Sequence, residues 1–259
     1  MLILLPPSEG KAAPARGKPL DLGALSFPSL TAARETVLDA LVDLCSGDEQ
    51  EAARVLGIGH TQLDLVEQDA GLRTAPTTRA DRVYTGVLYD ALDAATLSAA
   101  AKRRLGSRVA VTSSLFGLVR PADRIPAYRL SGDASLPATG PVAARWREVL
   151  GPAAEEAMGT GLLVDLRSGM YAAFWRPPAT LAKRVATVRV LHESGGKRSV
   201  VSHFNKATKG RIVRAVLEDG ANPRTPAALA ALLRDLGWHV EESAPGPKGT
   251  QLDVVVSEL

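Results

Sequence analysis

The segment KRSVVSHFNKATKGRIVR, Lys197 to Arg214, decides the fold of this chain, because it joins the second strand of a hairpin to the start of a helix. Before it, Gly195-Gly196 is a two-residue turn signal between the apolar runs VATVRVL and SVVSHF. After Asn205 the spacing of apolar residues becomes helical. The expected core stripe of this helix consists of Ile212, Val213, Val216 and Leu217. We therefore expect a hairpin that leads into an amphipathic helix.

The same segment gathers positive charge. The whole chain has 31 Lys and Arg against 28 Asp and Glu, yet these 18 residues contain no acid. Their cations are Lys197, Arg198, Lys206, Lys209, Arg211 and Arg214. Lys206 and Lys209 are expected in the first turn of the helix, near its core side, where the helix dipole disfavours cations. A phosphate held by free backbone N–H groups and these lysines explains the placement. A solvated basic face, or salt bridges to distant acids, is the alternative.

Composition indicates one globular α/β domain over residues 1–259. A hydrophobic content of 46% is ample for a core, and no linker or internal repeat divides the chain. Strands and helices alternate without a regular βαβ rhythm, which favours a mixed sheet with peripheral helices. The net charge of +3 is only mildly basic, so any nucleic-acid binding must come from local clusters. Aromatic residues are 4% of the chain, which disfavours a base-stacking platform for single strands.

The single cysteine and the first residues indicate a reducing, cytoplasmic location. Cys45 lies in an apolar helical pattern, so there is no disulfide framework, and burial is expected to raise its thiol pKa. The start, MLILLPPSEG, has a short apolar run broken by two prolines and no basic leader. It is expected to be a buried first strand rather than a signal peptide. No segment approaches transmembrane length.

The stretch EAARVLGIGHTQLDLVEQ suggests a DNA-binding helix-hairpin-helix, at about residues 48–69. Gly57-Ile58-Gly59 joins two short helices, and in such hairpins glycines let backbone N–H groups approach a DNA phosphate without regard to sequence. A plain helical hairpin with a glycine cap requires the same residues. Glu67 and Asp69 weaken the DNA interpretation, because they add negative charge.

Two further stretches place polar side chains where a ligand can reach them. SSLFGLVRPADRIPAYRL holds Arg120 and Arg129 in a loop stiffened by prolines, and such arginines suit bidentate recognition of phosphate or carboxylate. Alternatively, Asp123 forms an ion pair with one of these arginines, and the arginine holds the loop instead of a ligand. VDLRSGMYAAF follows a buried strand and places Asp165 and Tyr171 near its carboxyl end, a common location for binding residues.

Several enzyme motifs are excluded by spacing. The histidines His60, His192, His203 and His239 are scattered, and pairing about the glycine turn sets His192 opposite Ser199 and His203 opposite Val188. We therefore expect no metal site and no cofactor. The Ser-x-x-Lys match from Ser8 to Lys11 follows a strand and two prolines instead of opening a helix.

Five motifs together resemble the YaaA peroxide-stress protein family, in order and over nearly the whole chain: LLPPSEGK, VYTG, SLFGLVRPADRIPAYRL, VDLRSGMY and SHFNKATKGRIVR. The residues at expected family positions are Lys11, Tyr84, Arg120, Pro121, Tyr128, Arg129, Ser168, Tyr171, Lys206 and Gly210. The chain departs from the pattern at the Ser-Glu-Gly-Lys start (residues 8–11), at Asn205 and at Lys209. The resemblance implies a cytosolic single-domain protein, made under peroxide stress, that limits damage from free intracellular iron. It also implies a positively charged cleft and a helix-hairpin-helix that bind duplex DNA with little sequence preference.

Two functional hypotheses follow. In the first, the protein binds duplex DNA, and its contact residues are Gly57, Ile58, Gly59, Arg120, Arg129, Lys206, Lys209, Arg211 and Arg214. In the second, it is an enzyme that acts on a nucleotide or a nucleobase-like phosphorylated small molecule in the same cleft. Its catalytic residues are unassigned, with the candidates Lys11, Tyr84, Asp165 and Tyr171. A purely structural or partner-binding protein explains the lysine placement least well.

Overall fold

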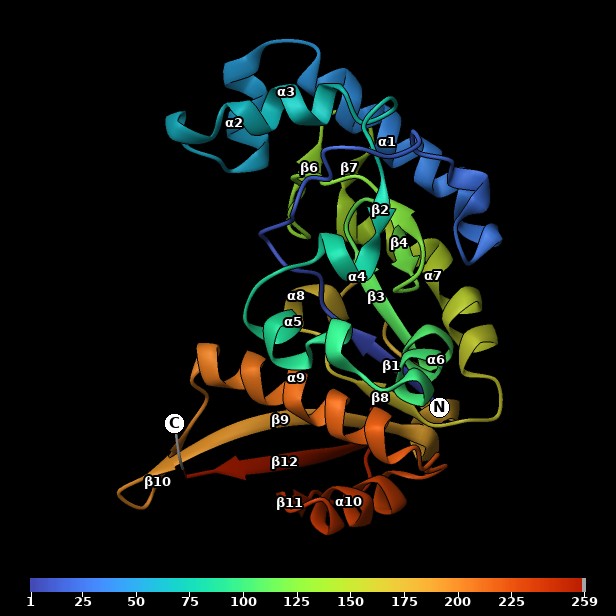
Figure 1. The fold of residues 1–259 in the computed structure, drawn as a ribbon, viewed down its shortest axis with the longest axis vertical. Helices are drawn as coiled ribbons and strands as arrows, with labels where there is room; N and C mark the ends of the chain where they lie inside the picture. Colours follow the sequence, from blue (N-terminus) through green and yellow to red (C-terminus); the bar gives the residue numbers. More distant parts are fainter. Residues whose placement is uncertain (258–259) are drawn as a thin grey trace.

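A mixed sheet forms the centre of the molecule (Figure 1). The computed structural model describes residues 1–257, apart from the side chains of residues 202–204. Five strands run parallel in the order β12-β9-β8-β1-β3: Thr250–Val256, Val185–Ser194, Leu163–Asp165, Leu2–Leu5 and Val109–Ser113. Antiparallel strands complete the sheet: β11 (His239–Glu242), β4 (Gly117–Val119) and β10 (Lys197–Ser199). The mixed sheet expected from the sequence is confirmed.

Burial follows the position of each strand. Every residue of β1, LILL, is buried, as is usual for a central parallel strand covered on both faces. In β9, by contrast, Val188 and Val190 are buried while Arg189 is exposed, so one face of the sheet meets solvent there. The remaining short strand pairs are β2 (Thr78–Arg79) with β5 (Arg124–Ile125), and β6 (Ser135–Leu136) with β7 (Gly140–Pro141).

Helices lie around the sheet. They are α1 (Thr31–Cys45), α2 (Glu49–Leu56), α3 (Asp64–Ala70), α4 (Ala80–Val83), α5 (Val87–Leu92), α6 (Ala99–Arg108), α7 (Val142–Met158), α8 (Gly169–Ala172), α9 (Ser202–Asp219) and α10 (Pro226–Asp235). In Figure 1, β9 and β12 run between α9 and α10, and α2 and α3 lie at the far end of the molecule. None of the described helices is long and apolar enough to span a membrane. Cys45 is buried at the end of α1, and burial raises its pKa to about 12.

The glycine turn forms the expected hairpin only in part. His192 pairs with Ser199, as the sequence predicts. The prediction that His203 faces Val188 is wrong, because β10 ends at Ser199 and α9 already begins at Ser202. A short run with one apolar face suits either a strand or a first helical turn, and the residues alone do not decide between them. The earlier start also moves Lys206 and Lys209 out of the first turn, away from the free N–H groups of the helix terminus.

The expected helix pair is present as α2 and α3. Gly57 ends α2 in the left-handed conformation (φ 62°), and a short 3-10 turn, His60–Gln62, precedes α3. The N–H groups of Gly57 and Ile58 bond to the carbonyls of Arg54 and Ala53, at 3.3 and 3.0 Å. This is a helical hairpin with a glycine cap, the simpler of the two arrangements considered.

Gly210 allows the closest helix contact near the site. A Cβ at this position of α9 would lie 2.2 Å from the Leu88 carbonyl oxygen of α5. Because neighbouring helix backbone occupies that space, the Gly210→Ala variant must push the two helices apart. We expect a loss of about 1–3 kcal/mol in unfolding free energy, measured by urea denaturation. In the matched control Gly106→Ala, within α6, the new methyl group meets nothing within 4 Å, so stability should stay equal or rise. Equal stability of both variants would contradict this packing.

Candidate functional site

A cavity of about 460 Å³ lies where strands β1 and β8 end. These neighbouring strands are parallel, so the segments that follow them, Pro6–Lys11 and Leu166–Ser168, meet at one edge of the sheet. Helices α5, α8 and α9 supply further walls, including Tyr89, Tyr171 and Lys206, and the loop from Arg129 to Ser131 supplies another. Carboxyl ends of parallel strands are the usual ligand position in α/β proteins.

Four cations line the cavity: Lys11, Arg129, Lys206 and Lys209. Lys206 is exposed, whereas Lys209 is buried and its Nζ donates to the Leu166 carbonyl oxygen at 3.0 Å. Burial lowers the pKa of Lys209, and the nearby carboxylate of Asp165 opposes that shift. Positive charge therefore extends from the rim to the interior of the cavity.

Lys11 is held by main-chain groups. Its Nζ donates to the carbonyl oxygens of Ser8 and Glu9, at 2.9 and 3.3 Å, and lies 4.2 Å from the ring centroid of Tyr128. Burial lowers the pKa of this lysine to about 7, with a smaller contribution from the charge of Arg129. Lys11 therefore changes charge near neutral pH, inside a cavity that carries other cations.

Arg129 is positioned through its backbone. Its N–H donates to both carboxylate oxygens of Asp69, at 2.9 and 3.2 Å, which ties the arginine loop to α3. Asp69 is fully buried, and burial raises its pKa to about 7. The side-chain Nε of Arg129 is buried and has no hydrogen-bond partner among the described residues. The arginine is thus fixed at its main chain while one side-chain donor stays unused.

Of the two tyrosine candidates, only Tyr171 lines the cavity. Burial raises its pKa to about 12, so its hydroxyl stays protonated at neutral pH and can donate. Tyr84 lies outside this cavity, and its hydroxyl is 3.1 Å from that of Tyr128, which in turn is 2.8 Å from Ser113 Oγ. Burial also raises the pKa of Tyr84. Tyr84 therefore supports the wall on which Lys11 rests.

Asp165 does not line the cavity. Its carboxylate forms a bidentate ion pair with Arg167, at 2.9 and 2.7 Å, and the two side chains are 8% and 1% exposed. Arg167 also donates to the carbonyl oxygens of Tyr171 and Trp175, at 3.3 and 2.9 Å. The ion pair joins the end of β8 to α8 and to the chain that follows α8, so its role is structural.

Three of the expected basic residues lie outside the cavity. The Nη1 of Arg120 donates to the Val109 carbonyl oxygen at 3.0 Å. Arg214 donates to the carbonyls of Leu92 and Asp93, at 3.0 and 2.9 Å, and so caps the end of α5. Arg211 is exposed on α9. The basic segment therefore does not act as one patch, since only Lys206 and Lys209 face the cavity.

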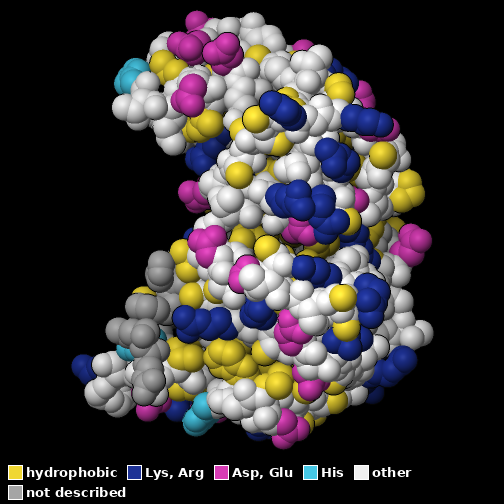
Figure 2. Space-filling view, viewed as in Figure 1, with side chains coloured by type: hydrophobic (Ala, Val, Ile, Leu, Met, Phe, Trp, Pro, Cys, Tyr) yellow, Lys and Arg dark blue, Asp and Glu magenta, His cyan; other side chains and the backbone are white. Residues whose placement is uncertain are grey.

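A second hollow, of about 730 Å³, adjoins the cavity. It is lined by Arg54 and Gly57 at the end of α2, and it shares Arg129 and Ser131 with the cavity. Figure 2 shows the molecule hollowed on one side, between the region of α2 and α3 and the region of the β9–β10 hairpin. We call the surface lined by the two hollows, with Gly57, Arg129, Ser131 and Lys206, the concave face.

Some residues of the site were not expected from the sequence. Asp69 was considered only as an unfavourable charge, and no local pattern indicates that it would be buried against Arg129. Ser8 bonds to the Thr85 N–H at 3.1 Å, and Asn205 and Tyr89 line the cavity. The Ser-x-x-Lys spacing was the available signal for the Ser8 segment. Among the described residues, no three His, Cys, Asp or Glu side chains converge as a metal site would require.

The charge of the cavity should depend on pH. As pH rises from 6 to 8, Lys11 loses its proton and Asp69 gains a negative charge, because the pKa of each lies at about 7. We therefore expect affinity for sulfate, whose charge is constant over this range, to fall roughly tenfold, measured by calorimetry. The Lys11→Met variant should bind weakly, with a much flatter profile. An equally steep profile in this variant would contradict the role of Lys11.

Comparison with known proteins agrees with the motifs. A family model described as peroxide stress protein YaaA matches residues 1–244. UPF0246 protein SCO2297 of Streptomyces coelicolor is 54% identical over 261 residues, covering 100% of both chains. A UPF0246 protein of Corynebacterium glutamicum strain R is 42% identical, over 98% of this chain and 100% of its own. The match along the chain shows that it belongs to the peroxide stress protein YaaA family.

Proposed function

We propose that this protein binds duplex DNA, without sequence preference, across the concave face and protects the cell during peroxide stress. The observation that carries the proposal is that two hollows share part of their lining. Arg129 and Ser131 line both, so the glycine turn after α2 and the exposed Lys206 of α9 border one surface. A groove with a backbone donor on one side and cations on the other suits phosphate contacts, which carry no sequence information.

The glycine turn would contact DNA through fewer groups than the sequence suggests. The N–H groups of Gly57 and Ile58 are used in the cap of α2, whereas Gly59 is exposed and its N–H has no partner among the described residues. A Cβ at Gly57 or Gly59 would meet nothing within 4 Å, so a phosphate can approach the main chain there. Gly59 is therefore the proposed backbone donor.

Acidic side chains restrict how DNA can approach this hairpin. The exposed acids of α2 and α3 include Glu49, Asp64 and Glu67, and they would repel phosphates along the flanks of the helices. Glu51 is neutralised by Arg54, with bonds of 2.8 and 2.6 Å. The approach must then be end-on, at the turn, with the sugar-phosphate backbone directed toward Arg129 and Lys206.

The peroxide-stress role follows from this contact. Radicals formed from peroxide and free iron attack DNA, and we propose that the protein limits this damage at the DNA, in the cytoplasm, rather than by storing iron. A second candidate function is an enzyme acting on a nucleotide or similar phosphorylated molecule. It is favoured by the inward position of Lys11 and Lys209 in a cavity of about 460 Å³. Volumes of about 300–1,000 Å³ are typical of small-molecule sites. Lys11 and Tyr171 are the catalytic candidates that line it.

Salt-dependent titration separates the two functions. Fluorescent duplexes of two unrelated sequences are titrated with protein at several salt concentrations, with AMP as competitor. DNA binding predicts similar Kd values for both sequences, a linear fall of log affinity with log salt, and no displacement by millimolar AMP. Absence of binding, or displacement by micromolar AMP, would favour the small-molecule function.

A further inference from the structure

Two buried polar atoms, on residues that line the cavity, lack a protein partner among the described residues. They are the Nε donor of Arg129 and the Oδ1 acceptor of Asn205. Buried polar atoms are nearly always hydrogen-bonded, so each unpaired one calls for an explanation. Both atoms are closed to solvent in this conformation, so after a rotation of each side chain toward the cavity a ligand with an acceptor for Arg129 and an N–H donor for Asn205 would satisfy both. Inorganic phosphate as the dianion has one O–H donor but no N–H group and no ring to pack against the walls of the cavity.

The remaining walls suit a flat heterocycle attached to a phosphate. Tyr89 and Tyr171 contribute aromatic rings. The cations at the open side, Lys206 and Arg129, suit a phosphate. A nucleotide combines these features, since its base carries ring and amino N–H donors while its phosphate carries only acceptors. The cavity volume of about 460 Å³ is adequate for one nucleotide and far too small for a duplex.

The position of the cavity indicates the source of that nucleotide. Arg129 and Ser131 line both the cavity and the hollow beside the glycine turn, so the cavity adjoins the surface proposed to bind DNA. Proteins that act on or inspect a base take it out of the stack into a pocket with polar groups and aromatic walls. We infer that the cavity receives a single nucleotide extruded from bound DNA, with its base near Asn205 and Tyr171 and its phosphate near Arg129 and Lys206.

This inference rests on the proposed DNA binding and makes it more specific. Extrusion requires unstacking and unpairing, which are least costly for a nucleotide that has no partner. A duplex with one bulged thymidine should therefore bind about tenfold more tightly than the fully paired duplex. The bulged base should also become inaccessible to reagents in solution, because it would lie inside the cavity.

The test combines affinity with chemical protection. The bulged and the paired duplexes are titrated by anisotropy, and permanganate, which oxidises unstacked thymine, is applied to the bulged duplex with and without protein. We expect the affinity preference and strong protection of the bulged thymine in the wild type. The Ser168→Phe variant fills the cavity from an exposed position, and Asn205→Leu removes the unpaired acceptor. Ser168→Phe should bind paired DNA normally but lose the preference and the protection, and Asn205→Leu, beside Lys206 on α9, should lose both relative to its own affinity for paired DNA.

The outcomes separate this inference from the proposed function. Equal affinity for both duplexes, with the thymine still reactive in the wild type, would overturn extrusion while leaving DNA binding in place. Failure to bind either duplex would overturn both. Micromolar binding of free dTMP that Ser168→Phe abolishes, without preference for the bulge, would show a free-nucleotide site and overturn extrusion. Unchanged preference and protection in both variants would place the bulged base outside the cavity and also overturn it.

Discussion

The Asp165→Asn variant is expected to lose about 3–5 kcal/mol of unfolding free energy, the usual effect of removing one member of a buried ion pair. The Asp165 and Arg167 side chains are 8% and 1% exposed, so solvent cannot compensate the guanidinium left behind. The neutral amide would also direct N–H groups toward the donors of Arg167. For a chain of this size the melting temperature should fall by roughly 10 °C, measured by calorimetry.

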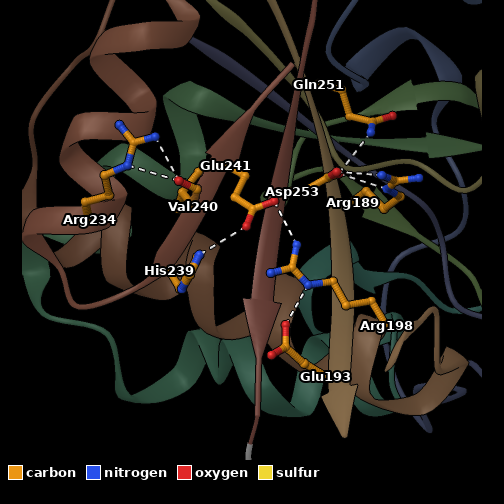
Figure 3. A network of polar contacts seen from close by, with 9 residues as sticks. All are labelled: Arg189, Glu193, Arg198, Arg234, His239, Val240, Glu241, Gln251 and Asp253. Carbon is orange, nitrogen blue, oxygen red and sulfur yellow. Dashed lines mark hydrogen bonds and ion pairs between the residues drawn. The ribbon is translucent and has the colours of Figure 1, made fainter. Parts of the chain in front are cut away.

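The control is Asp253→Asn, in a second Arg–Asp pair. Asp253 of β12 and Arg189 of β9 form a bidentate pair at 2.8 and 2.5 Å (Figure 3). Their side chains are 17% and 47% exposed, so we expect a change within about 1 kcal/mol. If Asp165→Asn proved as stable as this control but lost ligand binding, Asp165 would have to be returned to the candidate catalytic residues.

Removal of cations from the concave face should weaken DNA binding strongly. Each phosphate contact contributes about 0.9 to the slope of log affinity against log salt, so Lys206→Ala should reduce the slope by about 1 and the affinity roughly tenfold at 0.1 M salt. Lys206 is exposed at the rim of the cavity, and stability should hardly change. The double variant Lys206→Ala with Arg129→Met should lose roughly a hundredfold in affinity. Anisotropy titrations at four salt concentrations give both quantities.

Variants of two other lysines were considered as controls for the loss of DNA affinity. Lys102→Ala removes an exposed cation of α6, away from the concave face, and should leave the slope unchanged. Lys209→Ala is a poor probe, because its ammonium bonds to the buried carbonyl of Leu166 and its loss would also affect stability. Equal losses for Lys206→Ala and Lys102→Ala would indicate a diffuse charge effect and exclude a contact at the concave face.

The sequence predicted the elements well and their packing less well. The spacing of apolar residues and the turn residues predicted the glycine hairpin and the buried stripe of α9, because these depend on local spacing. The start of α9 was missed, since the run before Asn205 has no cap: Val201, at the N-cap position, offers no side-chain bond. Because α9 begins a few residues earlier than predicted, Lys206 and Lys209 do not lie in its first turn.

The structure brings some of the candidate site residues together and separates others. Lys11, Arg129, Lys206 and Lys209 line one cavity, and their use as an anion site stays a prediction. Arg120 and Arg214 bond instead to main-chain carbonyls, because long side chains serve as caps wherever a helix or strand end needs a donor. Asp69, distant in sequence from Arg129, binds its backbone N–H, and such tertiary contacts leave no local signal. The glycine turn joins two helices, as the sequence predicts. The cap of α2 uses the N–H groups of Gly57 and Ile58, which are two of the three expected donors.

The most direct test of a DNA-binding concave face is photocrosslinking to a duplex carrying bromodeoxyuridine, followed by mass spectrometry of the modified peptides. Contact across this face predicts adducts in two segments far apart in the chain. One contains Gly59 and His60 after α2, and the other contains Asn205 and Lys206 of α9. Adducts confined to surfaces outside the concave face, such as α10 or α6, would contradict the account.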